Sequence, residues 1–241
     1  MTDETFRNSA APVFRPGRVL VTGGASGLGA AVVEAVLEAG GTPVVLDRDI
    51  RNVAAAKAFE VDVADRVAVT AAVQEAAETL GGLDAVVTAA GIDRCGKLED
   101  VPAADWEQVV LVNLFGTVSV VRAALPYLKA SGGRVVTVAS TLGKRALPEA
   151  SAYCASKFGV VGFSHALAAE TGGEIGVTTM IPGGMKTRFF DDRADKYKPQ
   201  DDSRLNDPAN VAQAILFALS QPRGCEVREM LICHEDEGSW P

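Results

Sequence analysis

The sequence contains few of the residues from which metal sites and disulfide frameworks are built. Among 241 residues there are only two histidines, His165 and His234, and they show no ligand spacing with the cysteines. The four cysteines are far apart and form no CxxC pair: Cys95, Cys154, Cys225 and Cys233. We therefore expect reduced thiols that pack as small hydrophobic groups, and no metal site.

An excess of positive charge is also missing. The net charge is −8, with 23 Lys and Arg against 31 Asp and Glu, which argues against the basic face that nucleic acid requires. Apolar stretches are broken by Glu, Asp or Gly before the roughly 18 residues that a membrane span needs. No charged-then-apolar leader opens the chain, so we expect neither a membrane span nor a signal peptide, and a cytoplasmic protein.

The residues that are present suit a single α/β domain. Hydrophobic residues make up 48% of the chain, enough for a large core. Short β-branched runs near 19–22, 43–47, 59–62, 85–88, 134–139, 177–181 and 230–233 alternate with helical stretches such as 64–80, 103–129, 151–170 and 208–220. This alternation predicts a doubly wound parallel sheet of about seven strands with helices on both faces, over residues 18–241. Residues 1–17 are polar and aperiodic, which predicts an N-terminal arm.

A glycine-rich turn follows the first predicted strand. Gly23, Gly27 and Gly29 have GxxxGxG spacing, and a helical stretch begins directly after them. Glycines there allow a tight turn and let backbone N–H groups approach a pyrophosphate at a helix N-terminus. The second predicted strand ends at Asp47, where a dinucleotide-binding fold needs an acceptor for ribose hydroxyls. Strand, turn, helix, strand and terminal carboxylate together predict a dinucleotide site.

Tyr153 and Lys157 lie four residues apart in a predicted helix, and Ser140 ends the apolar run before it. A spacing of four places both side chains on one helix face. A neighbouring cation favours phenolate over phenol, so a lowered pKa would make Tyr153 an acid or base for an alcohol oxygen. Most Tyr and Lys pairs at this spacing are surface pairs, so the prediction depends on the other motifs.

Taken in order, these motifs resemble the short-chain dehydrogenase/reductase superfamily, in its compact single-domain branch, from about residue 18 to about residue 233. The segment 22–29 matches the family's TGxxxGxG turn, 62–63 its adenine contact and 182–187 its PGxxxT segment beside the nicotinamide. Asn113 matches the family's helix Asn. One departure is the family's NNAG segment, which reads Thr-Ala-Ala-Gly at 88–91; we expect the Thr88 hydroxyl to bond the backbone there.

The resemblance implies a Rossmann-like fold and reversible hydride transfer between a secondary alcohol and a nicotinamide cofactor. Tyr153 would be the acid or base, and Lys157 would lower its pKa and bond the nicotinamide ribose. Ser140 would hold the substrate oxygen, and Asn113 would interrupt its helix and hold a water on the proton path. Besides Tyr153 and Lys157, the predicted cofactor-binding residues are Gly23, Ser26, Gly27, Leu28, Gly29, Asp47, Arg48, Asp62, Val63, Ala89, Ala90, Gly91, Pro182, Gly183, Met185 and Thr187.

The charge at the end of the second strand bears on the choice of cofactor. Asp47 accepts hydrogen bonds from a ribose 2′-OH and repels a 2′-phosphate, which favours NAD over NADP. Arg48 follows directly, so NADP stays open. Two other readings of the fold also stay open. One is a dinucleotide-sensing regulator without turnover, which would have no need of the four catalytic positions. The other is an epimerase or dehydratase, although the chain lacks that branch's extra domain.

The long segment 183–207 is predicted to be a substrate lid, with little to hold it in place before ligand binds. Six cations flank the expected crevice, which favours a polar substrate such as a sugar, cyclitol or hydroxy acid: Arg94, Lys97, Lys144, Arg145, Lys186 and Arg188. The helices at 103–129 and 151–170 are apolar on more than one face, and family members commonly pair through them. We therefore expect a homodimer or homotetramer.

Overall fold

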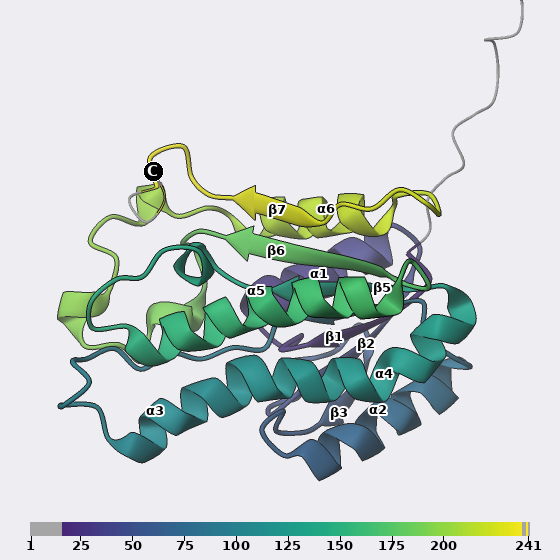
Figure 1. Ribbon diagram of the computed structural model, residues 1–241, viewed down its shortest axis with the longest axis horizontal. Helices are drawn as coiled ribbons and strands as arrows, with labels where there is room; N and C mark the ends of the chain where they lie inside the picture. Colours follow the sequence, from purple (N-terminus) through teal and green to yellow (C-terminus); the bar gives the residue numbers. More distant parts are fainter. Residues whose placement is uncertain (1–15, 238–239, 241) are drawn as a thin grey trace, which may run out of the picture.

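The computed structural model describes residues 16–237 and Trp240; most of the predicted N-terminal arm lies outside these residues. One parallel sheet of seven strands runs in the order β3-β2-β1-β4-β5-β6-β7 (Figure 1). The strands are β1 (Arg18–Thr22), β2 (Thr42–Asp47), β3 (Lys57–Glu60), β4 (Ala85–Thr88), β5 (Arg134–Val138), β6 (Gly176–Pro182) and β7 (Glu229–Ile232). The predicted α/β fold with a doubly wound parallel sheet is confirmed.

Helices cover both faces of this sheet. The α-helices are α1 (Gly27–Glu38), α2 (Arg66–Leu80), α3 (Ala103–Val110), α4 (Thr117–Ser131), α5 (Ser151–Thr171) and α6 (Pro208–Leu219). In the central strand, Val19 and Val21 belong to the core cluster formed with α1 and α6, whereas Leu20 packs in the cluster with α2, α4 and α5. Because side chains alternate along a strand, one apolar run supplies both cores.

The topology also positions a crevice. β1 lies between β2 and β4, so the chain winds outward in both directions from this strand. The arrowheads of β6 and β7 in Figure 1 point toward the edge where the segment after β6 lies. In an open α/β sheet of this kind, ligands bind beyond the carboxyl ends of the strands, where the order reverses.

Two predicted elements differ in detail. The third strand forms at Lys57–Glu60 instead of 59–62, because its register is set by β2, with Val44 opposite Lys57 and Asp47 opposite Glu60. The predicted helix at 103–129 is divided: between α3 and α4 the backbone forms a π-helical turn, η1 (Leu111–Gly116). Such turns interrupt α-helices mostly at functional sites.

The helical stretch Ala103–Ser131 is long and apolar enough to cross a membrane by length and composition, and 44% of its most apolar window is buried inside the protein. Core helices pass the same test. Val120, Val121, Ala124 and Leu128 of this stretch are fully or almost fully buried in the core cluster beneath the sheet, so packing accounts for its apolar character. The absence of a membrane span stays a prediction.

Candidate active site

The glycine turn between β1 and α1 has no room for side chains at two positions. A Cβ on Gly29 would lie 2.2 Å from the Gly23 carbonyl oxygen, and one on Gly23, whose φ is +68°, would lie 2.9 Å from the backbone of Ala90. Gly27 has a φ of +53°, and its Cβ position lies 3.4 Å from the Thr187 side chain. Ser26 caps α1 from extended backbone without a side-chain bond. The turn therefore presents bare backbone N–H groups on the side of Thr187.

Asp47 lies at the carboxyl end of β2, directly beside this turn. Its Oδ2 accepts the Ala25 N–H at 3.0 Å and its Oδ1 accepts the Asp49 N–H at 3.2 Å. These two bonds fix the carboxylate while leaving it further lone pairs for hydroxyl groups. Arg48 is exposed beside it, and Asp62 after β3 is exposed as well. A ligand at this end of the glycine turn would therefore face the fixed carboxylate of Asp47, with the exposed Arg48 cation beside it.

The segment after β4 brings Ala90 and Gly91 into the same crevice. Thr22 of β1 accepts the Ala90 N–H at 3.1 Å through its hydroxyl. The expectation for Thr88 is wrong: its hydroxyl is buried and has no hydrogen-bond partner among the described residues, because Thr22 already meets the backbone there. A Cβ on Gly91 would lie 3.4 Å from Asn113 Oδ1 and 3.7 Å from Lys157 Nζ. Gly91 thus lies between Asn113 and Lys157.

Asn113 lies in the π-helical turn, as the resemblance implied. Its side chain is fully buried. It accepts the Ile92 N–H at 2.8 Å and donates to the Ile92 carbonyl at 2.9 Å and to Ser156 Oγ at 3.0 Å. The amide therefore ties the segment after β4 to α5, and it is occupied by protein partners. A water held at this position would have to use the backbone of the turn.

Tyr153, Lys157 and Ser140 meet where β5 ends and α5 begins. All three side chains are buried, with 9%, 4% and 8% of their surfaces exposed. Ser140 forms a side-chain hydrogen bond with Tyr153. The Lys157 ammonium donates to the Val138 carbonyl at 2.8 Å and lies 5.6 Å from the centre of the Tyr153 ring. A hydroxyl, a phenol and an ammonium group thus converge in one dry site.

The pKa values in this site differ from the expectation. Burial raises the pKa of Tyr153 to about 12, although the hydrogen bond from Ser140 acts in the opposite direction. Burial also lowers the pKa of Lys157 to about 8. Loss of hydration penalises both charged forms, and here it outweighs any gain from placing them together. Ser140 and Arg193 are the groups that lower the pKa of Tyr153 here, and burial outweighs both; the role expected for Lys157 stays a prediction.

The segment 183–207 packs against this site through Phe189 and has several contacts that tie it to the rest of the protein; its role as a lid stays a prediction. Its base is pinned by Lys186 N–H to Asn206 O at 2.9 Å and by Asn206 N–H to Gly184 O at 2.9 Å. Further out, Arg193 forms an ion pair with Asp93 at 2.6 Å. Short 3₁₀ turns give the segment local structure at Arg188–Phe190, Asp195–Tyr197 and Asp202–Arg204. The prediction missed the anchor because Asp93 and Arg193 are 100 residues apart.

Phe189 belongs to the aromatic pair at 189–190 of this segment and packs on Tyr153 with ring centres 5.7 Å apart. A second contact involves a residue that was not found from the sequence. Glu237 accepts the Gly184 N–H at 2.9 Å, which ties a residue beyond the family resemblance to the hinge of the lid. A pocket of about 600 Å³ lies within the segment itself, lined by Lys186, Thr187, Arg188, Phe190, Asp191, Lys198, Pro199, Asp202 and Leu205.

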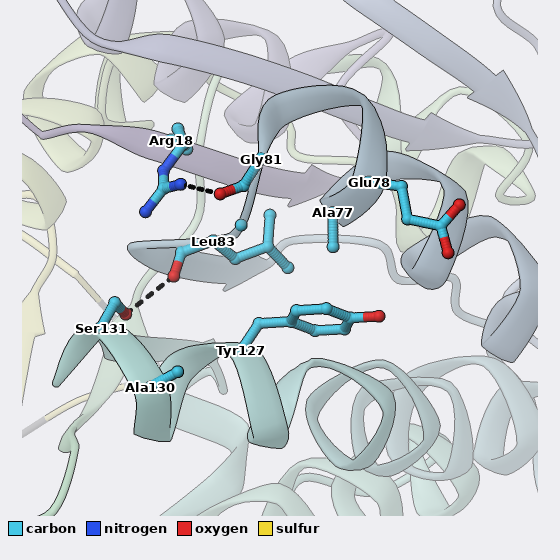
Figure 2. Close-up of a pocket in the computed structure, with 9 residues that line it drawn as sticks. Arg18, Ala77, Glu78, Gly81, Leu83, Tyr127, Ala130 and Ser131 are labelled. Atoms are coloured by element: carbon cyan, nitrogen blue, oxygen red, sulfur yellow. Dashed lines mark hydrogen bonds between the residues drawn. The ribbon is translucent and has the colours of Figure 1, made fainter.

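A second hollow, of about 410 Å³, lies near the amino ends of β1 and β4, between the last turns of α2 and α4 (Figure 2). Arg18 at its rim pairs with Asp84 at 2.7 Å and donates to the Gly81 carbonyl. Ser131 donates to the Leu83 carbonyl at 2.8 Å. These polar groups already have protein partners, and the hollow is remote from the carboxyl ends of the strands. The crevice at the carboxyl ends of the strands is therefore the candidate site.

Comparison with known proteins points to one family. The model of the short chain dehydrogenase family matches residues 17–198. D-threitol dehydrogenase of Mycolicibacterium smegmatis is 39% identical over 176 residues, 68% of each chain. The ligand-free aldohexose dehydrogenase of Thermoplasma acidophilum has the same fold, with a TM-score of 0.83 at 24% identity over 90% of this chain and 92% of that one. A short chain dehydrogenase of Burkholderia cenocepacia in complex with NADP gives 0.81 at 28% identity over 91% and 97%.

Proposed function

Since the chain belongs to the short-chain dehydrogenase family and is an oxidoreductase of that type, we propose that it interconverts a secondary alcohol and its ketone with a nicotinamide cofactor. The observation that carries the proposal is the convergence of Ser140, Tyr153 and Lys157 at the crevice edge that also holds the glycine turn. The test is a turnover screen of polar and apolar secondary alcohols, and of the matching ketones, with NAD(H) and NADP(H).

The residues of the crevice fit a dinucleotide. The bare turn at Gly23, Gly27 and Gly29 suits a pyrophosphate, Asp47 suits ribose hydroxyls, and Thr187 lies opposite Gly27. By the family resemblance, Asp62 and Val63 would contact the adenine. The nicotinamide ring, when bound, supplies the hydride acceptor or donor. The chain's own part is to position the alcohol carbon against that ring, to exclude water with the lid, and to move one proton at the Tyr153 hydroxyl.

Ser140 and Lys157 support the proton transfer. The Ser140 hydroxyl is within bonding reach of Tyr153 and would hold the same substrate oxygen. Lys157 donates to a single backbone carbonyl at 2.8 Å, which leaves further N–H donors for ribose hydroxyls. A high pKa suits Tyr153 as the acid in ketone reduction. As the base in alcohol oxidation, Tyr153 needs the ammonium or the bound cofactor to favour phenolate.

We propose NAD as the preferred cofactor. The wild type should bind NAD(H) at least about tenfold more tightly than NADP(H), because the fixed Asp47 carboxylate bonds a 2′-OH and repels a 2′-phosphate. Asp47→Ala should narrow or reverse this difference in affinity, because Arg48 can then pair with the 2′-phosphate of NADP(H). Asp49→Ala removes the same charge two residues away, from a group paired with Arg51 at 2.6 Å, and should change the ratio much less. Tighter NADPH binding by the wild type in a fluorescence titration would overturn the proposal.

A dinucleotide-sensing regulator without turnover is the alternative. It shares the cofactor cradle, so cofactor binding alone does not separate the two proposals. A regulator has no need of a buried phenol bonded to a serine beside a buried lysine, because buried polar groups cost stability unless they are used or paired. Reduction of a nicotinamide by any alcohol in the screen decides for the enzyme.

We further propose a two-fold oligomer that buries the outer face of η1 and α5. Phe115 is 56% exposed on η1 and Phe158 is 45% exposed on the neighbouring α5. Light scattering at micromolar concentration should give a dimer or tetramer, and Phe158→Glu should reduce the mass because it puts a charge into the apolar contact. Val67→Glu places the same charge at a 73% exposed residue of α2 and should leave the mass unchanged. A monomeric wild type would contradict the proposal.

A further inference from the structure

A buried ion pair joins the lid to the sheet. Arg193 Nη2 lies 2.6 Å from Asp93 Oδ2, and the two side chains are only 16% and 3% exposed. Asp93 follows β4 in the segment that carries Gly91, whereas Arg193 lies in the lid. A pair removed from water in this way is stable only when its remaining polar atoms are satisfied.

Each partner keeps one buried polar atom that has no hydrogen bond. Asp93 Oδ1 is an acceptor and Arg193 Nε is a donor, and neither has a partner among the described residues. The other carboxylate oxygen of Asp93, Oδ2, accepts hydrogen bonds both from Arg193 Nη2 and from the Cys95 thiol, the latter at 3.1 Å. Buried groups without partners are rare in native proteins and are common where a ligand completes them.

The two atoms belong to the wall of the site already described. The Arg193 guanidinium stacks 5.2 Å from the ring centre of Phe189 and 4.6 Å from that of Phe190. Phe189 in turn packs on Tyr153 at 5.7 Å. After burial and the hydrogen bond from Ser140, the charge of Asp93 is the next influence on the pKa of Tyr153, which it raises. The pair is therefore close to the phenol.

An acceptor and a donor on the two members of one ion pair match one hydroxyl group. A hydroxyl donates its proton to Asp93 Oδ1 and accepts from Arg193 Nε. A substrate carboxylate fits badly, because Asp93 already neutralises Arg193 and its free oxygen would repel a second anion. Several rim cations are engaged as well: Lys144 pairs with Glu229 and Arg188 with Asp191. These contacts speak against a hydroxy acid and for a neutral substrate.

We propose that Asp93 and Arg193 together bind a second hydroxyl of the substrate, next to the carbon that reacts at Tyr153, so that the substrate is a neutral vicinal polyol. The inference rests on the proposed function. The second hydroxyl of the substrate then supplies the hydrogen bonds that Asp93 Oδ1 and Arg193 Nε lack. A substrate with a single hydroxyl leaves these two atoms unpaired. Sites built to bond a hydroxyl reject analogues that lack it by large factors.

The test compares meso-2,3-butanediol with 2-butanol, which differ by that hydroxyl alone. The wild type should favour the diol in kcat/KM by on the order of 10²-fold. Asp93→Leu with Arg193→Met replaces the ion pair by apolar side chains, a change that buried pairs often tolerate. It should remove the preference, because kcat/KM should fall about 10²-fold further for the diol than for 2-butanol.

Two further variants keep the test decisive. Asp93→Asn retains an acceptor oxygen, and its kcat/KM should fall about tenfold further for the diol than for 2-butanol. This variant provides the test if the double variant does not fold. Asp195→Asn alters an exposed residue of the same segment, which pairs with Lys198 at 3.1 Å, and should leave kcat/KM unchanged for both substrates. Equal losses on both alcohols would overturn the inference, because the pair would then only hold the lid. A wild type without preference would overturn it too, and a wild type that binds cofactor but turns over no alcohol or ketone in the screen would overturn the proposed function itself.

Discussion

Tyr153→Phe should lower kcat by about 10²–10⁴-fold while leaving the cofactor dissociation constant within a few fold. The ring keeps its packing against Phe189 and its place over Lys157, so only the hydroxyl that moves the proton is lost. The hydrogen bond with Ser140 is lost with it, but the Ser140 hydroxyl remains to hold the substrate oxygen. Steady-state kinetics on the best alcohol from the screen, with cofactor titrations on the same protein, give both values.

Tyr127→Phe is the matched control. Tyr127 lies on α4 beside the hollow near the amino ends of β1 and β4 (Figure 2), away from the carboxyl ends of the strands, so removal of its hydroxyl should leave kcat unchanged. Near wild-type turnover by purified Tyr153→Phe would contradict the assigned proton transfer. A large loss of cofactor affinity in that variant would instead assign Tyr153 a binding role.

Asn113→Ala should lower the free energy of unfolding by about 2–5 kcal/mol. The change leaves the Ile92 N–H, the Ile92 carbonyl and Ser156 Oγ without the partners that the buried amide supplies. Each buried group left unsatisfied costs about 1–3 kcal/mol. Turnover should fall as well, because the segment that carries Gly91 and Asp93 loses its tie to α5. Chemical denaturation, with kinetics below the transition, measures both effects.

Asn210→Ala provides the comparison. Asn210 is exposed on α6 and bonds only the Asn206 side chain, at 3.0 Å, so its removal should cost less than about 0.5 kcal/mol. If Asn113→Ala were as stable as the wild type, the amide would not be the tie that its three hydrogen bonds indicate. An unchanged stability with lost turnover would favour the proton path that the resemblance implied.

The parts of the fold that depend on local pattern could be predicted from the sequence. Val19 and Val21 face one core and Leu20 the other, so a continuous apolar run already indicated a central parallel strand. The role of Gly29 could be assigned from the glycine spacing, and the structure gives the reason: a Cβ there would lie 2.2 Å from a carbonyl oxygen, so only glycine fits. The edge strand β3 was shifted by two residues, since its ends are set by pairing with β2 and not by its own composition.

The parts that depend on contacts across the chain could not be predicted. The residues around Arg193 in the sequence do not indicate that it pairs with Asp93. The segment 183–207 was therefore predicted to have little holding it in place, whereas a buried ion pair ties it to the segment after β4. The raised pKa of Tyr153 follows from burial under Phe189 and its neighbours, whereas the sequence showed only the neighbouring Lys157. Thr88 carries a hydroxyl where the family has Asn, but Thr22 on the adjacent strand takes the bond.

Deuterium transfer tests hydride transfer most directly. An alcohol that the wild type oxidises is labelled with deuterium at the carbinol carbon, and the reduced cofactor is isolated and examined by mass spectrometry. If Tyr153 removes the hydroxyl proton while the carbinol hydrogen passes to the nicotinamide ring, the reduced cofactor carries one deuterium, and the Tyr153→Phe protein forms almost none of it. Reduced cofactor without the label, or bound cofactor that no alcohol reduces, would contradict the proposed chemistry.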